Sequence, residues 1–241
     1  GSDNVFLVQP VTGDTNWILI DQTGVSNLVE APLGLVGNNN LIDVRQDGTE
    51  NNALVATDGD NHNLTIYQDG DMNTAEMVLG VDGNSADIYS RGNNNYAGVG
   101  LVGSDNITDI MQRGDDNFAV VDVVGDDNEI SVDQMGNTNE VLITSAVVVV
   151  ENNISVQQDG DLNLVDMLVE GSGNLADILQ EGNGNWVAGN DGYFALSGEN
   201  GTVAISQLGN DNLVLGEQYG NGNIMNITQL GDFNTAIVTQ N

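Results

Sequence analysis

One short motif recurs along nearly the whole chain: Gly, two variable residues and then Asn. Counted by its Gly, the motif has 20 steps, most of them eleven residues apart, with Val81 and Val149 in place of Gly at two of them. Asn stands three residues later at 18 of the 20 steps, and His62 and Gly201 are the exceptions. A fixed short period is typical of a repeat array and outweighs the length of 241 residues as a guide to domain number.

The residue two places before each Gly shows that the true repeat is twice as long. At alternate steps it is Gln or Ser, namely Gln22, Gln46, Gln68, Ser90, Gln112, Gln134, Gln158, Gln180, Gln207 and Gln229. At the steps between it is mostly aliphatic, namely Val11, Leu35, Thr57, Leu79, Leu101, Val123, Val147, Val169, Leu196 and Gln218. The period is therefore 22 residues, repeated ten times, and insertions near Pro32, near Val147 and from Asn190 to Phe194 leave the register intact.

Apolar and polar residues alternate on both sides of the motif. In residues 40–46, Asn40, Ile42, Val44 and Gln46 occupy every second position, and a period of two predicts a half-buried strand. A single pair of strands buries too little apolar surface to be stable alone, so we expect the units to stack. The sequence predicts an all-β protein, a β-solenoid of about ten 22-residue strand-turn-strand rungs, with two parallel, in-register, amyloid-like sheets around an aliphatic core.

Stacking in register places each inward Gln and Asn on an identical residue of the next rung. We expect each side-chain amide to donate to the amide of the next rung, which avoids the cost of an unpaired buried polar group. The ladder Gln residues are those given above, and the ladder Asn residues are Asn27, Asn51, Asn73, Asn117, Asn139, Asn163, Asn185, Asn212 and Asn234.

Acidic residues far outnumber basic ones, and the formal net charge is -33. This balance argues against nucleic acid as a partner. The longest aliphatic run, Ala146 to Val150, is too short to cross a bilayer as a helix, so no membrane insertion is expected. The chain contains no Cys, which excludes disulfides and thiolate metal sites.

His62 is the only histidine, and we interpret it as a substituted ladder position, since no nucleophile is marked out near it. We expect no enzyme activity, no catalytic residue and no cofactor. The segments 69–73 and 159–163 begin like calcium loops but carry Thr74 and Leu164 where such a loop needs Gly. Weak calcium binding by acidic rows is the alternative, and it predicts assembly that responds to divalent cations.

Two copies of the repeat are the clearest: Gln112-Arg-Gly-Asp-Asp-Asn117-Phe-Ala119 and Gln229-Leu-Gly-Asp-Phe-Asn234-Thr-Ala236. This pattern resembles the curlin repeat of bacterial curli subunits over most of the chain. The resemblance implies a secreted subunit, either major subunit or nucleator, of an extracellular cell-surface amyloid fibre with a role in the biofilm matrix and adhesion. It also implies as partners further copies of the chain, a nucleator and an outer-membrane secretion channel. The chain departs from the family in having mostly Leu or Val where curlin repeats carry a second Gln, and in having no Lys.

The two ends of the chain carry separate expectations. Residues 1–10 are interpreted as a segment before the array, with Gly1-Ser2 as a tag remnant and the rest as a partial cap or a secretion segment. Residues 11–241 are the solenoid. We expect the last strand to be the polymerisation end, through Asn234, Ala236, Val238 and Gln240, because an uncovered parallel edge is a template for the next chain.

A rival hypothesis is a non-polymerising extracellular β-solenoid, a stalk or a scaffold that binds a ligand through outward aromatic residues. The candidates are Tyr89, Tyr96, Phe118 and Trp186. Their scattered positions argue against one binding site. Assembly state distinguishes the two hypotheses, because a scaffold stays monomeric.

Overall fold

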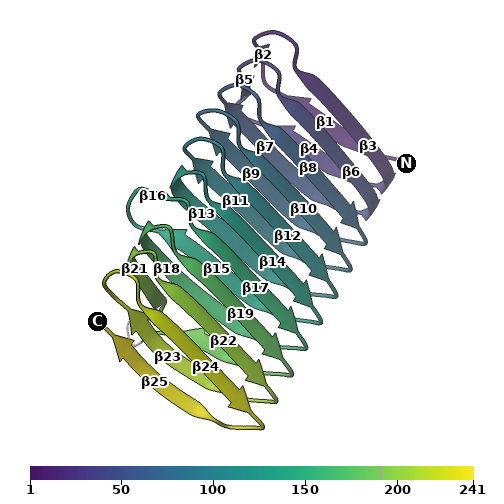
Figure 1. The fold of residues 1–241 in the computed structure, drawn as a ribbon. Coiled ribbons are helices and arrows are strands. Elements are labelled where there is room, and N and C mark those ends of the chain that lie inside the picture. The colour runs from purple at the N-terminus through teal and green to yellow at the C-terminus, as the bar shows by residue number, and fades with distance from the viewer. Residues whose placement is uncertain (190–191) are drawn as a thin grey trace.

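The structure is a computed structural model that describes all residues except 190–191. It is a single stack of parallel rungs with two sheets facing each other, and no helix occurs in the described residues (Figure 1). The prediction of an all-β solenoid with two parallel sheets is confirmed, with about eleven turns instead of ten.

The first sheet has ten strands, which follow one another along the stack in chain order. They are β3 (Trp17–Val25), β6 (Leu41–Thr49), β8 (Asn63–Asp69), β10 (Ser85–Arg91), β12 (Ile107–Arg113), β14 (Glu129–Met135), β17 (Asn153–Asp159), β19 (Leu175–Glu181), β22 (Thr202–Leu208) and β24 (Ile224–Leu230). We call this sheet A.

The second sheet, sheet B, has fifteen strands, because insertions divide some rungs into two short strands. They are β1 (Val5–Val8), β2 (Val11–Thr12), β4 (Leu28–Ala31), β5 (Leu35–Val36), β7 (Asn52–Asp58), β9 (Thr74–Gly80), β11 (Tyr96–Val102), β13 (Phe118–Asp126), β15 (Glu140–Ser145), β16 (Val149–Val150), β18 (Leu164–Ser172), β20 (Trp186–Ala188), β21 (Phe194–Glu199), β23 (Leu213–Gln218) and β25 (Thr235–Gln240).

Like residues pair with like in both sheets. In sheet A, Ile66 pairs with Ile88 and Gln46 with Gln68. In sheet B, Ala75 pairs with Ala97. Inward residues of both sheets form one continuous aliphatic core, in which most members are less than 5% exposed. Burial of this apolar surface is the main stabilising contribution to the stack.

The turns between the sheets require Gly because neighbouring rungs lie so close. At Gly48, φ is 129°, and a Cβ atom would lie 1.9 Å from the carbonyl oxygen of Gly70 in the next rung. Two residues later Glu50 adopts φ 58°, a left-handed conformation that ends the turn. This steric demand recurs at most turns and accounts for the Gly of the eleven-residue period, with Val81 and Val149 as the exceptions.

The three insertions lie at different places in their rungs. The first falls between β4 and β5, after Ala31. In the second, Val147 does not share the inward position of the other residues two places before an anchor: Ser145 pairs with Val169, and Val147 lies in the bulge that follows and is 50% exposed. The spacing of the motif allows either Ser145 or Val147 to lie opposite Val169. The pairing of β15 with β18 shows that it is Ser145.

The third insertion was predicted to run from about Asn190 to Phe194, and the predicted C-terminal boundary at Phe194 is wrong. Phe194 pairs with Met167 and is fully buried, so the inserted residues end at Tyr193; residues 190–191 lie outside the described residues. Room for the ring comes from the next rung, where a Cβ atom on Gly216 would lie 2.7 Å from it. A large residue in one rung is thus compensated by Gly in the next.

Residues 1–8 extend sheet B at one end of the stack. β1 pairs in parallel with β4, from Val5 opposite Leu28 to Val8 opposite Ala31. Asn4 lies in the ladder position of this rung, and its Oδ1 accepts the backbone N–H of Asn27 at 3.0 Å. Phe6 and Val8 continue the inward face, although Phe6 is still 45% exposed.

Candidate functional site: the amide ladders and the end strands

The predicted Gln residues lie in one row along the inner face of sheet A. Nε2 of each Gln donates to Oε1 of the Gln in the next rung, at 2.9 Å from Gln22 to Gln46 and at 2.8 Å from Gln207 to Gln229. The second N–H of each amide donates across the core to a carbonyl of sheet B, as Gln112 does to Tyr96 at 2.9 Å. The row therefore connects rungs to each other and the two sheets to one another.

The Gln row has one defect, at Ser90. The Ser90 hydroxyl donates to Gln112 Oε1 at 3.1 Å, so the bond toward the C-terminal side is kept. On the other side the Nε2 atom of Gln68 bonds only to the carbonyl of Asn52. The hydroxyl is too short to continue the row in both directions.

The predicted Asn residues lie in a second row at the entrance to sheet B. From Asn51 onward, Asn Oδ1 accepts both the backbone N–H and the side-chain amide of the Asn in the next rung, for example Asn95 Oδ1 from Asn117 at 3.0 and 3.1 Å. The same Nδ2 atom also donates to the carbonyl of the next turn, as Asn117 does to Gly136 at 2.9 Å. The structure adds Asn95 to this row.

A matching Asn row stands at the other edge, at the entrance to sheet A. It includes Asn84, Asn106, Asn128 and Asn152, which repeat the same bonds. Its two irregular members are the exceptions in the motif. Gly201 keeps the backbone bond alone, donating its N–H to Asn174 Oδ1 at 2.8 Å.

His62 is the other irregular member, and the structure places it inside this row. Its side chain is 1% exposed, and its backbone N–H donates to Asn40 Oδ1 at 2.8 Å. Neither ring nitrogen has a hydrogen-bond partner. Burial lowers the pKa of His62 below its usual value, which keeps the imidazole neutral near pH 7.

A further row, on the outside of the turns, was missed by the sequence analysis. At many turns the backbone N–H of the residue after the anchor Gly donates to the side-chain oxygen of its counterpart in the next rung, as Asn93 does to Asp115 at 2.8 Å and Asp115 to Asn137 at 3.0 Å. Along one edge Asp and Asn alternate from Asp71 to Asn183. Carboxylates are thereby two rungs apart, about 10 Å, near the distance over which salt screens them.

The signal for this row was present in the sequence. The first residue after the anchor Gly is Asp or Asn at most steps, and the alternation has twice the 22-residue period. In the structure these residues add hydrogen bonds between rungs, and in the row from Asp71 to Asn183 the alternation also keeps like charges apart. At the other edge Asp60 and Asp82 are direct neighbours.

The end strands carry the residues predicted to polymerise. Ala236, Val238 and Gln240 lie on the inner face of β25 and are half-buried, whereas Ala97 and Val99, in the same two positions of an inner rung, are at most 3% exposed. Asn234 donates its amide to Asn212 at 2.9 Å, as in inner rungs. Figure 1 shows β24 and β25 at one end of the stack and β1 and β3 at the other.

The four outward aromatic residues of the rival hypothesis do not form one surface. Tyr89 lies on sheet A, where it stacks on Tyr67, whereas Tyr96 lies on sheet B and stacks on Phe118 with ring centroids 5.0 Å apart. Burial and the hydrogen bond from its hydroxyl to Glu76 raise the pKa of Tyr96 to about 12. Trp186 is on β20, several strands farther along sheet B.

Comparison with protein families gives one match. The model of the curlin associated repeat matches residues 37–77, 103–136, 151–182 and 198–231, which together make up more than half of the chain. The chain belongs to the curlin-repeat family. A search of curated proteins for relatives gave no match.

Family membership indicates a curli-type structural protein. The departure from the curlin pattern is visible in sheet B, where the position of the second Gln holds a Gln pair only at the C-terminal end, with Gln218 donating to Gln240 at 3.0 Å. In the part of the chain that the structure describes, no helix is long and apolar enough to cross a membrane. Among the same residues, no three acidic or His side chains lie close enough together to hold a metal ion.

Proposed function

We propose that the protein is a structural subunit of an extracellular curli-type amyloid fibre, in which copies of the chain stack end to end through their end strands. The observation that carries the proposal is the single direction of the Gln row. Wherever a Gln of the row bonds the Gln of the next rung, its Nε2 donates toward the C-terminal side, so Gln229 presents a donor at one end and Gln22 an acceptor at the other. A second copy would continue this row without any change of side-chain direction.

The inner faces of the end strands also match. With Gln229 placed on Gln22 of the next copy, Ile227 of β24 lies on Ile20 of β3, and Met225 lies on Ile18. Half-buried core residues of both strands would be covered by this contact. Unpaired backbone groups of the two strand edges would pair in the same parallel pattern as inside the stack.

Such a junction has one requirement. Because β1 and β25 both belong to sheet B, pairing β24 with β3 requires β25 of one copy to take the place of β1 against β4 of the next. β1 is the less buried of the two neighbours of β4, and Val5, Phe6 and Leu7 are each at least 40% exposed. We expect β1 to be displaced when copies join.

A disulfide tests this requirement in a chain without Cys. Leu7 and Glu30 are paired and project outward, so Leu7→Cys/Glu30→Cys locks β1 to β4 at a separation that suits a disulfide. We expect the oxidised variant to grow fibres much more slowly than the same variant after reduction. Leu142→Cys/Asp166→Cys is the matched control in the middle of sheet B, and its oxidation should have no effect.

Family membership supports the remaining parts of the proposal, namely a nucleator and an outer-membrane secretion channel as partners, and a role in biofilm matrix and adhesion. Electron microscopy and fibre diffraction of the purified chain, across a range of NaCl and calcium concentrations, test the assembly. Unbranched fibres with a reflection near 4.7–4.8 Å are the expected result. Folded monomers under all conditions would contradict it and favour a non-polymerising scaffold.

A further inference from the structure

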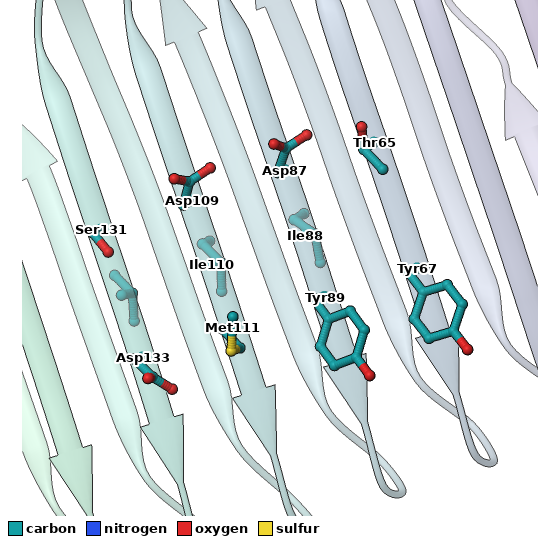
Figure 2. Close-up of a pocket in the computed structure, with 11 residues that line it drawn as sticks. Thr65, Tyr67, Asp87, Ile88, Tyr89, Asp109, Ile110, Met111, Ser131 and Asp133 are labelled. Atoms are coloured by element: carbon teal, nitrogen blue, oxygen red, sulfur yellow. The ribbon is translucent and has the colours of Figure 1, made fainter.

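An open groove of about 410 Å³ runs along the outer face of sheet A across β8, β10, β12 and β14 (Figure 2). Two rows of side chains form its walls, and each row has one member on each strand. The floor is strand backbone, because the side chains between the rows point into the core. One wall consists of Thr65, Asp87, Asp109 and Ser131, and the other of Tyr67, Tyr89, Met111 and Asp133.

The second wall is largely apolar. The rings of Tyr67 and Tyr89 stack with centroids 4.9 Å apart and planes 8° from parallel, and the Met111 side chain continues the row (Figure 2). Stacking fixes the rings in position, so the groove is preformed. A wall of ring edges and a thioether suits aliphatic or aromatic carbon.

The groove also carries negative charge with no cation paired to it. Asp87 and Asp109 are in register on neighbouring strands, about 4.8 Å apart. The ion pairs of the described residues join Arg45 to Asp43 and Arg91 to Asp69, and neither involves an acid of the groove.

Two further observations concern the carboxylates of Asp109 and Asp133, which also line the groove. Partial burial and the neighbouring carboxylates of Asp87 and Glu129 raise the pKa of Asp109. Asp133 Oδ1 is buried and has no hydrogen-bond partner. The ion pairs of the described residues leave Asp87, Asp109 and Asp133 without a cation, and these carboxylates lie beside a largely apolar wall. The nearby Arg113 guanidinium contacts the sulfur of Met111 in that wall.

From this arrangement we infer that the groove is a binding site for a linear aliphatic polyamine. Ammonium groups separated by three- or four-carbon spacers have nearly the spacing of neighbouring strands, so consecutive groups can bond Asp87 and Asp109. The methylene chain then lies along Tyr67, Tyr89 and Met111. A compact metal ion fits less well, since no three acidic side chains of the described residues converge on one point.

The site is independent of fibre assembly. It lies on the outer face of sheet A in the middle of the stack, away from the end strands, and stays accessible whether or not copies join. A bound polycation would also reduce the repulsion of a chain with a net charge of -33.

Isothermal titration of the full chain with spermidine at fixed ionic strength tests the inference. We expect one saturable site per chain and binding at least tenfold weaker in Asp87→Asn/Asp109→Asn. The matched control, Asp21→Asn/Asp122→Asn, removes the same charge from outward positions outside the groove and should bind within twofold of the original chain. Tyr67→Thr/Tyr89→Thr keeps the charge and should weaken binding through loss of the apolar wall.

Two results would overturn the inference. One is equal spermidine affinity of the Asp87→Asn/Asp109→Asn variant and the original chain. The other is displacement of spermidine by an equal concentration of Mg²⁺, which would show binding to diffuse surface charge. Circular dichroism of each variant confirms that the fold is retained, and Thr and Asn already occupy outward strand positions elsewhere in sheet A.

Discussion

The two sheets differ in the kind of side chain that fills the last inward position of each rung. Sheet A has a row of Gln there, and its inner members are fully buried with each amide bonded to the next rung, except at Gln68, which precedes Ser90. Sheet B has Leu, Val or Thr at most of the equivalent positions, with Leu79 and Leu101 equally buried. A buried polar row is stable only if each side chain has a hydrogen-bonding partner in the next rung. The stability of an aliphatic row depends only on how well the side chains fill the available space.

The boundary between the two kinds of row shows the cost of mixing them. Gln218 follows Leu196 in sheet B. Its Nε2 donates to Gln240, but its Oε1 is buried without a partner because Leu196 offers no donor. Rows of one kind therefore persist over many rungs, and they hold the register because a shifted rung would place amides on aliphatic side chains.

Leu101→Gln should give the largest loss of stability, because it places an amide between Leu79 and Val123. We expect about 4 kcal/mol from the lost apolar burial together with the unpaired amide. Leu101→Met, which keeps an apolar side chain of similar volume, should cost less than about 1.5 kcal/mol. Denaturant unfolding of monomeric chains measures both, and a cost below that of Leu101→Met would contradict the comparison.

Gln134→Leu makes the reverse change in sheet A. It leaves Gln112 Nε2 and Gln158 Oε1 without one partner each, and the carbonyl of Phe118 loses its bond from Gln134. With about 1 kcal/mol for each lost bond, the expected cost is about 3 kcal/mol. A neutral or stabilising result in the same unfolding experiment would show that the Gln row does not depend on continuity.

His62→Asn should repair the Asn row and stabilise the chain by about 1–2 kcal/mol, since an amide can bond where the ring nitrogens have no partner. The difference should grow on acidification. Burial lowers the pKa of His62, so the unfolded chain binds the proton first, and stability is lost as the pH falls below the unfolded value of about 6.5 toward the lower folded pKa.

Unfolding from pH 8 to pH 5 measures this difference between the two chains. Comparison with His62→Asn is necessary because Asp109 and Asp166 have raised pKa values, so their protonation stabilises the folded chain at low pH. These carboxylates act equally in both chains. A constant difference across the range would contradict the account of His62.

Ser90→Gln should give the smallest effect, a gain of about 1 kcal/mol, by supplying an acceptor to Gln68 Nε2 and completing the row. The slot holds Gln in the neighbouring rungs, so space is expected to be available. A higher denaturation midpoint with an unchanged slope is the predicted readout. A lower midpoint would mean that Ser90 is required by the packing of its own rung.

The period of the sequence predicted the sheets, their parallel register and the inward rows, because each depends on a demand that recurs in every rung. Features that occur once were not predictable in the same way. The positions of Ser145 and Val147 depend on which residues of an insertion pair with the neighbouring rung, and the motif is in register on either side. Phe194 packs over Gly216 of the next rung, and this contact occurs once, so the repeat does not predict it.

The groove could also not be predicted from the sequence. Along a single strand the outward residues are of different kinds, as Thr65 and Tyr67 are on β8. Only the stacking of strands brings Tyr67 and Tyr89 into contact and aligns Asp87 with Asp109. The row of alternating Asp and Asn outside the turns was recognisable in principle, since it is periodic.

Growth of fibres from preformed seeds tests the end-to-end stacking most directly. The parallel ladder, in which Leu213 N–H donates to the carbonyl of Asn234, directs the N–H of Ile237 to the free side of β25. Ile237→Pro removes that donor without removing a hydrogen bond inside the chain, and Ile237→Thr is the matched control that keeps it. We predict that Ile237→Pro stays folded but fails to extend seeds, whereas Ile237→Thr extends them normally. Equal seeded growth of the two variants would contradict assembly through the edge of β25.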